Sequence, residues 1–528
     1  MTREDIPFAS LSNGGTLPLD RVPSFSADEV GRITRECIGL GLRVSAYFGA
    51  ILGGAKGVAA RFPELFMVLA DDERSRLLAA RAPTDGRSFP SIAADCPQVQ
   101  LFEREIAEQF GLVPEGHPWL KPVRYTRSWT GRDAWGREAG APILPGVGDF
   151  YRVEGEQVHE VAVGPVHAGV IEPGHFRFQC SGERVMHLEI ALGYQHRGVE
   201  EALIGGPDAR SLHYLETVSG DSSIAHASTY CQLLEALSHR CRPARAQAIG
   251  AIALELERLA CHIGDLGAIA GDTGFLPTSS YCGRIRGDFL NMTAFLCGNR
   301  FGRNLLAPGG LWRDLEGERA KVLGARLAKG ERDVKSAIDL MWDSQSVLAR
   351  LEGTGVLPRE VALELGIVGP AARASGLPRD VRFDQSSGMY RLAQIPVSTS
   401  DTGDVLGRAF IRWLEVQRSL EFIKEQLECL PGGSVLDGEA ASTRSRNSPR
   451  NARRLEPNCL AVALNEGWRG EVCHVAITDS AGAFARYKIV DPSFHNWPAL
   501  AYVLRDQEIS DFPLCNKSFN LSYCGHDL

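Results

Sequence analysis

The sequence predicts an α+β protein in which a small N-terminal α+β domain is followed by a mostly helical bundle with small peripheral β-sheets. Residues 36–125 mix helix-like and strand-like stretches, and we assign residues 1–125 to the first domain. From residue 159 the pattern changes to long helices, so residues 159–528 form the second domain. Residues 126–158 are rich in Gly, Pro and charge, which predicts a linker between the two.

The N-terminal domain contains one clear helical signal. Residues 102–110 have the spacing of a short amphipathic helix, and Gly111 is placed to stop it. The following residues, 114–118, contain two prolines and a glycine. They predict a turn-rich exit from this helix.

The strongest helical pattern covers residues 244–270. Pro243 can occupy its first turn and Gly271 can end it. Glu255 and Arg258 fall away from the apolar stripe, as does His262. The stripe recurs at alternating spacings of three and four and comprises Ile249, Ile252, Leu256, Leu259, Ile263, Leu266 and Ala270.

Other stretches complete the predicted bundle. A second long helix is expected at 404–429, and further helices are expected near 185–203, 221–240 and 283–300.

The C-terminal part departs from this helical pattern. Residues 431–457 are poor in apolar residues and rich in Ser, Asn, Gly and Arg, which is typical of a mobile loop. Beyond them, residues 472–477 and 486–490 have strand-like composition, so we expect a small sheet that caps the bundle.

Composition excludes several classes of protein. The formal net charge is −8 and charged residues make up 23% of the chain, so nothing indicates nucleic-acid binding. We find no apolar run of the ~18 residues that a membrane span needs, and the N-terminus lacks the pattern of a secretory signal. The 13 cysteines include no C-x-x-C pair, so we expect buried thiols rather than a zinc or Fe–S site.

Five short motifs follow one another along the chain, and their common order is more specific than any one of them. They are GPVHAG at 164–169, LGYQHRGVE at 192–200, GNRFGR at 298–303, EGWRGE at 466–471 and DPSFHNW at 491–497. Together they resemble the large subunit shared by group 4 [NiFe]-hydrogenases and respiratory complex I, where it is the D-type component. FPS…FEREIAEQFGLVPEGHPWLKPVR, at residues 89–124, is similar to the C-type component of complex I. This fused C/D arrangement most resembles the large subunits of formate hydrogenlyase and hydrogenase-4.

The resemblance fails at the hydrogenase metal ligands. Residues 216–226 resemble the motif E-x-V-C-G-x-C-x-x-x-H, but Ser219 and Ser222 stand where the family has cysteines. In the C-terminal D-P-C-x-x-C motif, Leu521 takes the first cysteine position and Cys524 the second. One thiolate cannot hold a Ni–Fe pair, so we expect no metal at these four degenerate positions.

The resemblance implies roles for polar groups that remain around them. Glu200 matches the proton-relaying glutamate of the R-G-x-E motif, Arg469 matches the cavity arginine, and His226 holds the motif histidine position. A buried carboxylate among apolar helices would have a raised pKa, which suits proton relay. The alternative is structural, with Glu200 and Arg469 pairing across the bundle.

The resemblance to complex I implies a different activity, the reduction of a quinone. His175 matches the histidine that contacts the quinone head group in that family, whereas the tyrosine position falls on Thr217. Tyr214 lies nearby but one helical turn away. An imidazole and a phenol could donate protons to a quinone carbonyl, but only half of this pair is evident.

These observations lead to three hypotheses. The first is the large subunit of a membrane-associated, energy-converting oxidoreductase, peripheral on the cytoplasmic side of the cell membrane. It would reduce a quinone-like acceptor or couple electron transfer to ion translocation. The second is a non-catalytic scaffold between an Fe–S subunit and a membrane arm, and the third is a hydrogenase with altered ligands.

The resemblance also implies partners and cofactors. We expect a small Fe–S subunit with a [4Fe-4S] cluster, antiporter-like membrane subunits, and no cofactor on this chain except a quinone. No G-x-G-x-x-G opens a helix after a strand, so any NADH site is expected on another subunit.

Overall fold

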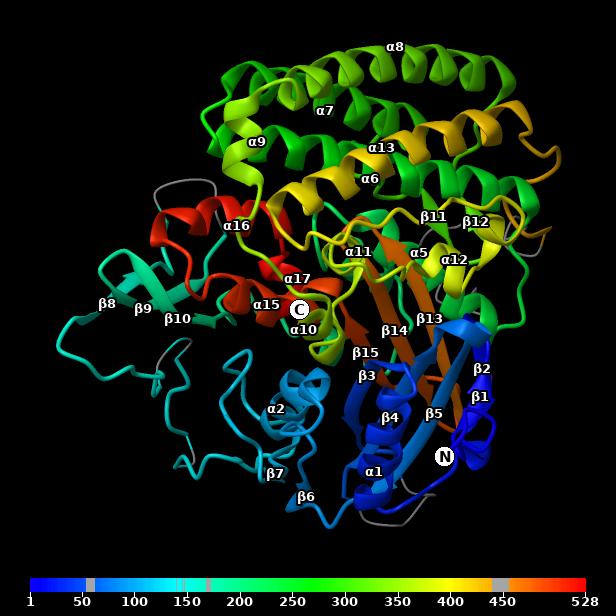
Figure 1. Ribbon diagram of the computed structural model, residues 1–528. Helices are drawn as coiled ribbons and strands as arrows, with labels where there is room; N and C mark the ends of the chain where they lie inside the picture. Colours follow the sequence, from blue (N-terminus) through cyan, green and yellow to red (C-terminus); the bar gives the residue numbers. More distant parts are fainter. Residues whose placement is uncertain (54–61, 139, 145, 147, 168–171, 439–454) are drawn as a thin grey trace.

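Figure 1 shows the computed structural model of the chain, which describes residues 1–528 except 54–61, 139, 145, 147, 168–171 and 439–454. Helices and mainly antiparallel sheets occupy separate parts of the chain, so the predicted α+β class is confirmed. The long helices stack at the top of the view, and the N-terminal sheet lies at the bottom beside the last strands of the chain.

The N-terminal part is built on an antiparallel sheet with strand order β1-β5-β4-β3. Helices α1 and α2 pack against it, and Ser26 begins α1 with a capping box shared with Glu29. The predicted helix at 102–110 is confirmed as part of α2, with Gly111 in the left-handed conformation directly after it. The bounds are β1 Ala9–Leu11, α1 Ala27–Gly39, β3 Arg43–Ala50, β4 Glu64–Asp71, β5 Arg76–Pro83 and α2 Gln100–Phe110.

A second sheet, with order β15-β14-β13-β2, connects the two halves of the molecule. Both predicted C-terminal strands are confirmed within β14 and β15, and β2 from the N-terminus pairs with β13. Alternate residues of β13 face opposite cores: Leu460 and Val462 pack with the N-terminal domain, Ala461 and Ala463 with the helices. The sheet therefore lies between the two cores instead of capping the bundle. The bounds are β2 Gly15–Pro18, β13 Cys459–Gly467, β14 Gly470–Thr478 and β15 Phe484–Val490.

The bundle is organised around α6, which packs against α7 and α13. Its predicted range of 244–270 is confirmed to within two residues, and the helices expected at 221–240, 283–300 and 404–429 are confirmed as α5, α7 and α13. Glu255, Arg258 and His262 are buried although they lie off the apolar stripe, because α6 is enclosed on all sides. The bounds are α5 Ser223–Leu237, α6 Ala244–Asp272, α7 Leu276–Cys297, α8 Gly317–Trp342 and α13 Val405–Glu428.

The prediction of a helix near 185–203 is wrong. This segment begins as strand β10, which pairs with β9 in a three-stranded sheet with β8, and only the short α3 follows. Val185 and Leu188 are buried while their neighbours Arg184 and Met186 are exposed, and this partial alternation fits a half-covered strand. The bounds are β8 Val158–Val163, β9 His175–Ser181, β10 Arg184–Ala191 and α3 Val199–Ala202.

Short elements complete the chain. They are β6 Ser88–Pro90, β7 Val113–Glu115, α4 Ser211–Leu215, β11 Leu306–Ala307, β12 Gly310–Leu311, α9 Gln345–Leu351, α10 Arg359–Glu364, α11 Gly369–Ala374, α12 Val381–Asp384, α15 Pro492–Val503, α16 Phe512–Phe519 and α17 Tyr523–Asp527.

Two sequence expectations concern irregular segments. The described part of the expected linker, 126–158, contains no helix, and its strand β8 starts only at Val158. Most of the expected mobile loop, 431–457, lies outside the described residues. The domain boundaries stay predictions. Within the described part of the chain, every helix is too short or too polar to cross a membrane.

Candidate functional site

The side chain of Arg469 contacts two of the positions at which the hydrogenase resemblance places metal ligands. Arg469 occupies the tight turn between β13 and β14, and its guanidinium donates to both carboxylate oxygens of Asp221, at 2.7 and 2.8 Å. The same group lies 3.3 Å from the Ser219 hydroxyl and 3.4 Å from that of Ser222. A cation therefore contacts both serines that replace the family's cysteines.

This ion pair is held strongly in its charged form. Burial alone would raise the pKa of Asp221, but the contact with Arg469 lowers it below its ordinary value. The pKa of Arg469 is raised, because the attraction of Asp221 outweighs the cost of burial. The Trp468 ring covers the guanidinium at 3.9 Å from the ring centroid.

Three of the four degenerate ligand positions are linked by polar contacts: Arg469 contacts Ser219 and Ser222, and Ser522 connects Ser219 to Cys524. The Ser219 hydroxyl is 2.9 Å from that of Ser522, which is 3.4 Å from the Cys524 sulfur. Leu521 is buried in the apolar core of the bundle. Burial raises the pKa of the Cys524 thiol, so it stays protonated at neutral pH.

A Ni–Fe pair does not fit this arrangement. Two hydroxyls, a leucine and one thiol stand in place of the family's four cysteines, and one thiolate cannot hold a Ni–Fe pair. Among the described residues no group of three or more His, Cys, Asp or Glu side chains could hold a metal ion.

Glu200 does not pair with Arg469. Its carboxylate accepts from Arg486 at 2.9 Å and from Lys488 at 3.0 Å, both on β15. Burial would raise the pKa of Glu200, but these two cations lower it below its ordinary value. The expected rise in pKa is therefore wrong, and Glu200 is an ionised carboxylate in a buried ion-pair network.

His226 lies in a buried chain of polar side chains. Its Nε2 is 3.0 Å from the Asp491 carboxylate, and its Nδ1 is 3.1 Å from Nε2 of His474. The hydroxyl of Tyr487 is 2.9 Å from Nδ1 of His474. Burial lowers the pKa of His474 well below its ordinary value, so this imidazole is neutral.

The two residues expected to contact a quinone each lie within hydrogen-bond distance of backbone carbonyls. Nδ1 of His175, at the start of β9, is 3.2 Å from the Gly164 carbonyl. The hydroxyl of Thr217 donates to the carbonyls of His213 and Tyr214, at 3.1 and 3.0 Å. Among the described residues these two side chains share no hydrogen bond.

Two carboxylates at the site escaped the sequence analysis. Asp221 lies between the two serines of the motif in the sequence, and this position could have identified it as a candidate site residue. Glu257 on α6 accepts from the backbone N–H groups of Ile224 and Ala225 at 2.7 and 3.3 Å. Burial raises the pKa of Glu257 to about 8. Asp221 and Glu257 line a cavity of about 10 Å³, enough for about one water.

Family profiles match two parts of the chain. The profile described as "Respiratory-chain NADH dehydrogenase, 49 Kd subunit" matches residues 272–527, and the one described as "Respiratory-chain NADH dehydrogenase, 30 Kd subunit" matches 50–135. The chain belongs to the family that unites the D-type component of complex I with the group 4 hydrogenase large subunits, in its fused C/D form.

Individual relatives agree with this class. Formate hydrogenlyase subunit 5 of Escherichia coli K12 is 30% identical, over 82% of this chain and 76% of that protein. Hydrogenase-4 component G of the same organism is 27% identical, over 85% and 77%. NADH-quinone oxidoreductase subunit 4 of Thermus thermophilus is 29% identical, over 67% and 90%.

A solved structure shares the fold. It belongs to the membrane-bound sulfane sulfur reductase, described as an archaeal respiratory membrane complex. The TM-score is 0.65 at 22% sequence identity, covering 72% of this chain and all (100%) of that one.

Proposed function

We propose that the chain is the large subunit of a membrane-associated, energy-converting oxidoreductase complex, peripheral on the cytoplasmic side. A partner subunit would carry the [4Fe-4S] cluster, and antiporter-like subunits would form the membrane arm. The chain would couple electron arrival at that cluster to ion translocation, without hydrogen chemistry. The contact of Arg469 with Ser219, Ser222 and Asp221 carries this proposal.

A continuous chain of polar contacts leads from Arg469 into the helical bundle and supports coupling between electron arrival and ion translocation. Its Nε donates to the Asn520 carbonyl, and the Asn520 amide donates to Asp265. Asp265 in turn accepts from Arg412 of α13 at 2.8 Å. Charges interact more strongly in a protein interior than in water, so a change of charge near Asp221 acts along this chain into the bundle.

Reduction of a quinone-like acceptor is the second candidate. It is favoured by Glu172, which precedes β9 and accepts from the backbone N–H of Cys524 at 3.2 Å. This contact places the segment that leads to His175 beside the degenerate positions. The Thr217 hydroxyl, however, already donates to backbone carbonyls, so only His175 is left as a proton donor.

The test compares electron transfer with ion uptake in the purified complex, reconstituted into vesicles. Asp221→Asn breaks the ion pair, and Asp314→Asn, which breaks the half-exposed pair with Arg245, is the matched control. Coupling predicts that Asp221→Asn loses ion uptake while electron transfer continues. Unchanged uptake would favour the scaffold, and loss of quinone turnover in His175→Ala would favour the second candidate.

A further inference from the structure

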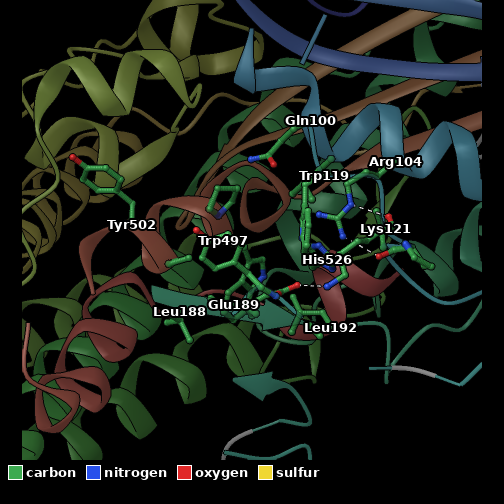
Figure 2. A pocket seen from close by; sticks show the side chains of 18 of the residues that line it. Gln100, Arg104, Trp119, Lys121, Leu188, Glu189, Leu192, Trp497, Tyr502 and His526 are labelled. Carbon is green, nitrogen blue, oxygen red and sulfur yellow. Dashed lines mark hydrogen bonds and ion pairs between the residues drawn. The ribbon is translucent and has the colours of Figure 1, made fainter. Parts of the chain in front are cut away.

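A second cavity lies away from Arg469, between the N-terminal domain and the C-terminal helices (Figure 2). Its volume is about 460 Å³, within the range of small-molecule sites. Helix α2 and residues 118–125 form one wall, and β10 and α15 form the other. The cavity thus uses both parts of the fused chain, and neither part alone would enclose it.

The walls are mostly aromatic and aliphatic. Such surfaces bind the flat, apolar body of a ligand by stacking and burial. The aromatic lining residues are Trp119, Tyr125, Tyr151, Trp497 and Tyr502, and the aliphatic ones include Leu101, Leu188, Leu192 and Ala501.

Arg104 supplies a positive charge that forms no direct ion pair in the described part of the chain. Its Nε and Nη2 donate to the backbone carbonyls of Lys121 and Pro122, at 2.8 and 2.9 Å. Among the described residues no carboxylate lies within ion-pair distance of this guanidinium. Burial lowers the pKa of Arg104 more than the nearby Tyr125, Glu108 and Glu189 raise it. Arg104 is half-buried, and a partly desolvated cation is stabilised by a partner of opposite sign.

The other polar groups leave the cavity positive. Among the described lining residues, Glu189 is the one carboxylate, and it is occupied by Lys121 and by the backbone N–H of Tyr151. Arg505 adds a further cation beside the Tyr502 ring. Trp497 keeps a buried Nε1–H without an acceptor in the described part of the chain. Positive charge is therefore available to a ligand, whereas Glu189 is already engaged.

We propose that this cavity binds a small amphipathic anion, an aromatic ring system bearing a carboxylate. The ring would lie against the aromatic walls and the carboxylate would pair with Arg104. This site is independent of the coupling role proposed above, because none of its lining residues belongs to the Arg469–Asp221 cluster.

The test uses three probes of the same shape, 2-naphthoate, 2-naphthamide and 2-naphthylmethylammonium. Their binding to the purified complex is measured by titration calorimetry. We expect naphthoate to bind about tenfold or more tightly than the amide, as a charge-assisted hydrogen bond would give, and the cation to bind weakest. Arg104→Gln should remove this preference, while Arg418→Gln on the exposed side of α13 should keep it.

Arg104 also holds two backbone carbonyls, so a second variant fills the cavity without touching that arginine. Ala501→Phe should abolish binding of both naphthoate and naphthamide while the complex stays assembled. Equal binding of anion and amide to the unaltered complex would overturn the proposal. Naphthoate binding that survives Ala501→Phe in a folded complex would also overturn it.

Discussion

Arg469 and Asp221 form a bidentate ion pair beside the two serines that replace cysteine ligands of the family's hydrogenases. The two N–H···O distances are 2.7 and 2.8 Å, and two serine hydroxyls contact the same guanidinium. A buried guanidinium therefore lies beside two positions at which the family has thiolate ligands. The predictions below follow from this pair and from the buried charges around it.

Asp221→Asn should destabilise the protein, because it leaves the buried Arg469 without a counterion. We expect a loss of about 2 kcal/mol, less than for a fully buried pair since the Asp221 side chain is 32% exposed. Urea unfolding monitored by circular dichroism measures it. The control variant Asp314→Asn should lower the free energy of unfolding by less than about 1 kcal/mol. Equal losses in both variants would show that the Arg469–Asp221 pair stabilises the fold no more than an exposed pair does.

Glu200→Gln should lower the free energy of unfolding more than Asp221→Asn does, by about 3–5 kcal/mol. The reason is that Arg486 and Lys488 would both lose a buried partner. Its neighbour Glu201 is exposed, so Glu201→Gln is the control and should change stability by less than about 0.5 kcal/mol. The free energy of unfolding measured in urea decides. A Glu200→Gln protein as stable as the Glu201→Gln protein would show that the ion-pair network does not stabilise the fold.

The lowered pKa of Glu200 also gives a pH dependence with a definite sign. Its stabilising effect is fully present above its ordinary pKa of 4.5 and is lost as the pH falls toward the lowered value. The stability difference between the unaltered protein and Glu200→Gln should therefore shrink below about pH 4.5. A difference that grows on acidification would contradict the ionised state of Glu200.

Glu257 should show the opposite dependence. Its pKa is raised to about 8 from an ordinary value of 4.5, so the folded protein holds a proton there that the unfolded chain releases. The contribution of Glu257 to stability is therefore full below 4.5 and is lost as the pH rises toward 8. Glu257→Gln should flatten the fall of the urea midpoint in this range, whereas Glu421→Gln, on the exposed side of α13, should not. An unchanged slope in Glu257→Gln would refute the raised pKa.

Restoring cysteines should not restore a metal site. The double variant Ser219→Cys, Ser222→Cys would have three thiols with Cys524, but Leu521 supplies no ligand and Arg469 contacts both altered positions. We expect elemental analysis of the purified double variant to find no stoichiometric nickel. Nickel bound in stoichiometric amount would show that three thiols at these positions are enough to hold it.

Local sequence signals predicted the elements whose residues specify them without help from distant parts of the chain. The helix at α6 has a regular apolar stripe, and Gly111 ends α2 as expected. The segment near 185–203 has only a partial alternation, and its strand β10 is specified by pairing with β9. The burial of β13 on both faces was not predictable, because β2 and the N-terminal core supply one of those faces.

The location of the candidate site could be predicted from the sequence, but the ion-pair partners and pKa shifts of its residues could not. The motifs predicted that Ser219, Ser222 and Cys524 lie near one another, and contacts through Arg469 and Ser522 link them. The partners of Glu200 come from β15, almost three hundred residues away, and no local pattern links them. The pKa direction of Glu200 therefore depended on tertiary contacts, and burial alone predicted the wrong sign.

The nickel content of the purified native complex tests the central claim most directly. If the Arg469–Asp221 pair has taken the place of the metal, elemental analysis will find iron from the partner's cluster and only background nickel. One nickel per chain would contradict the account, because it would show that Ser219, Ser222, Leu521 and Cys524 hold the metal.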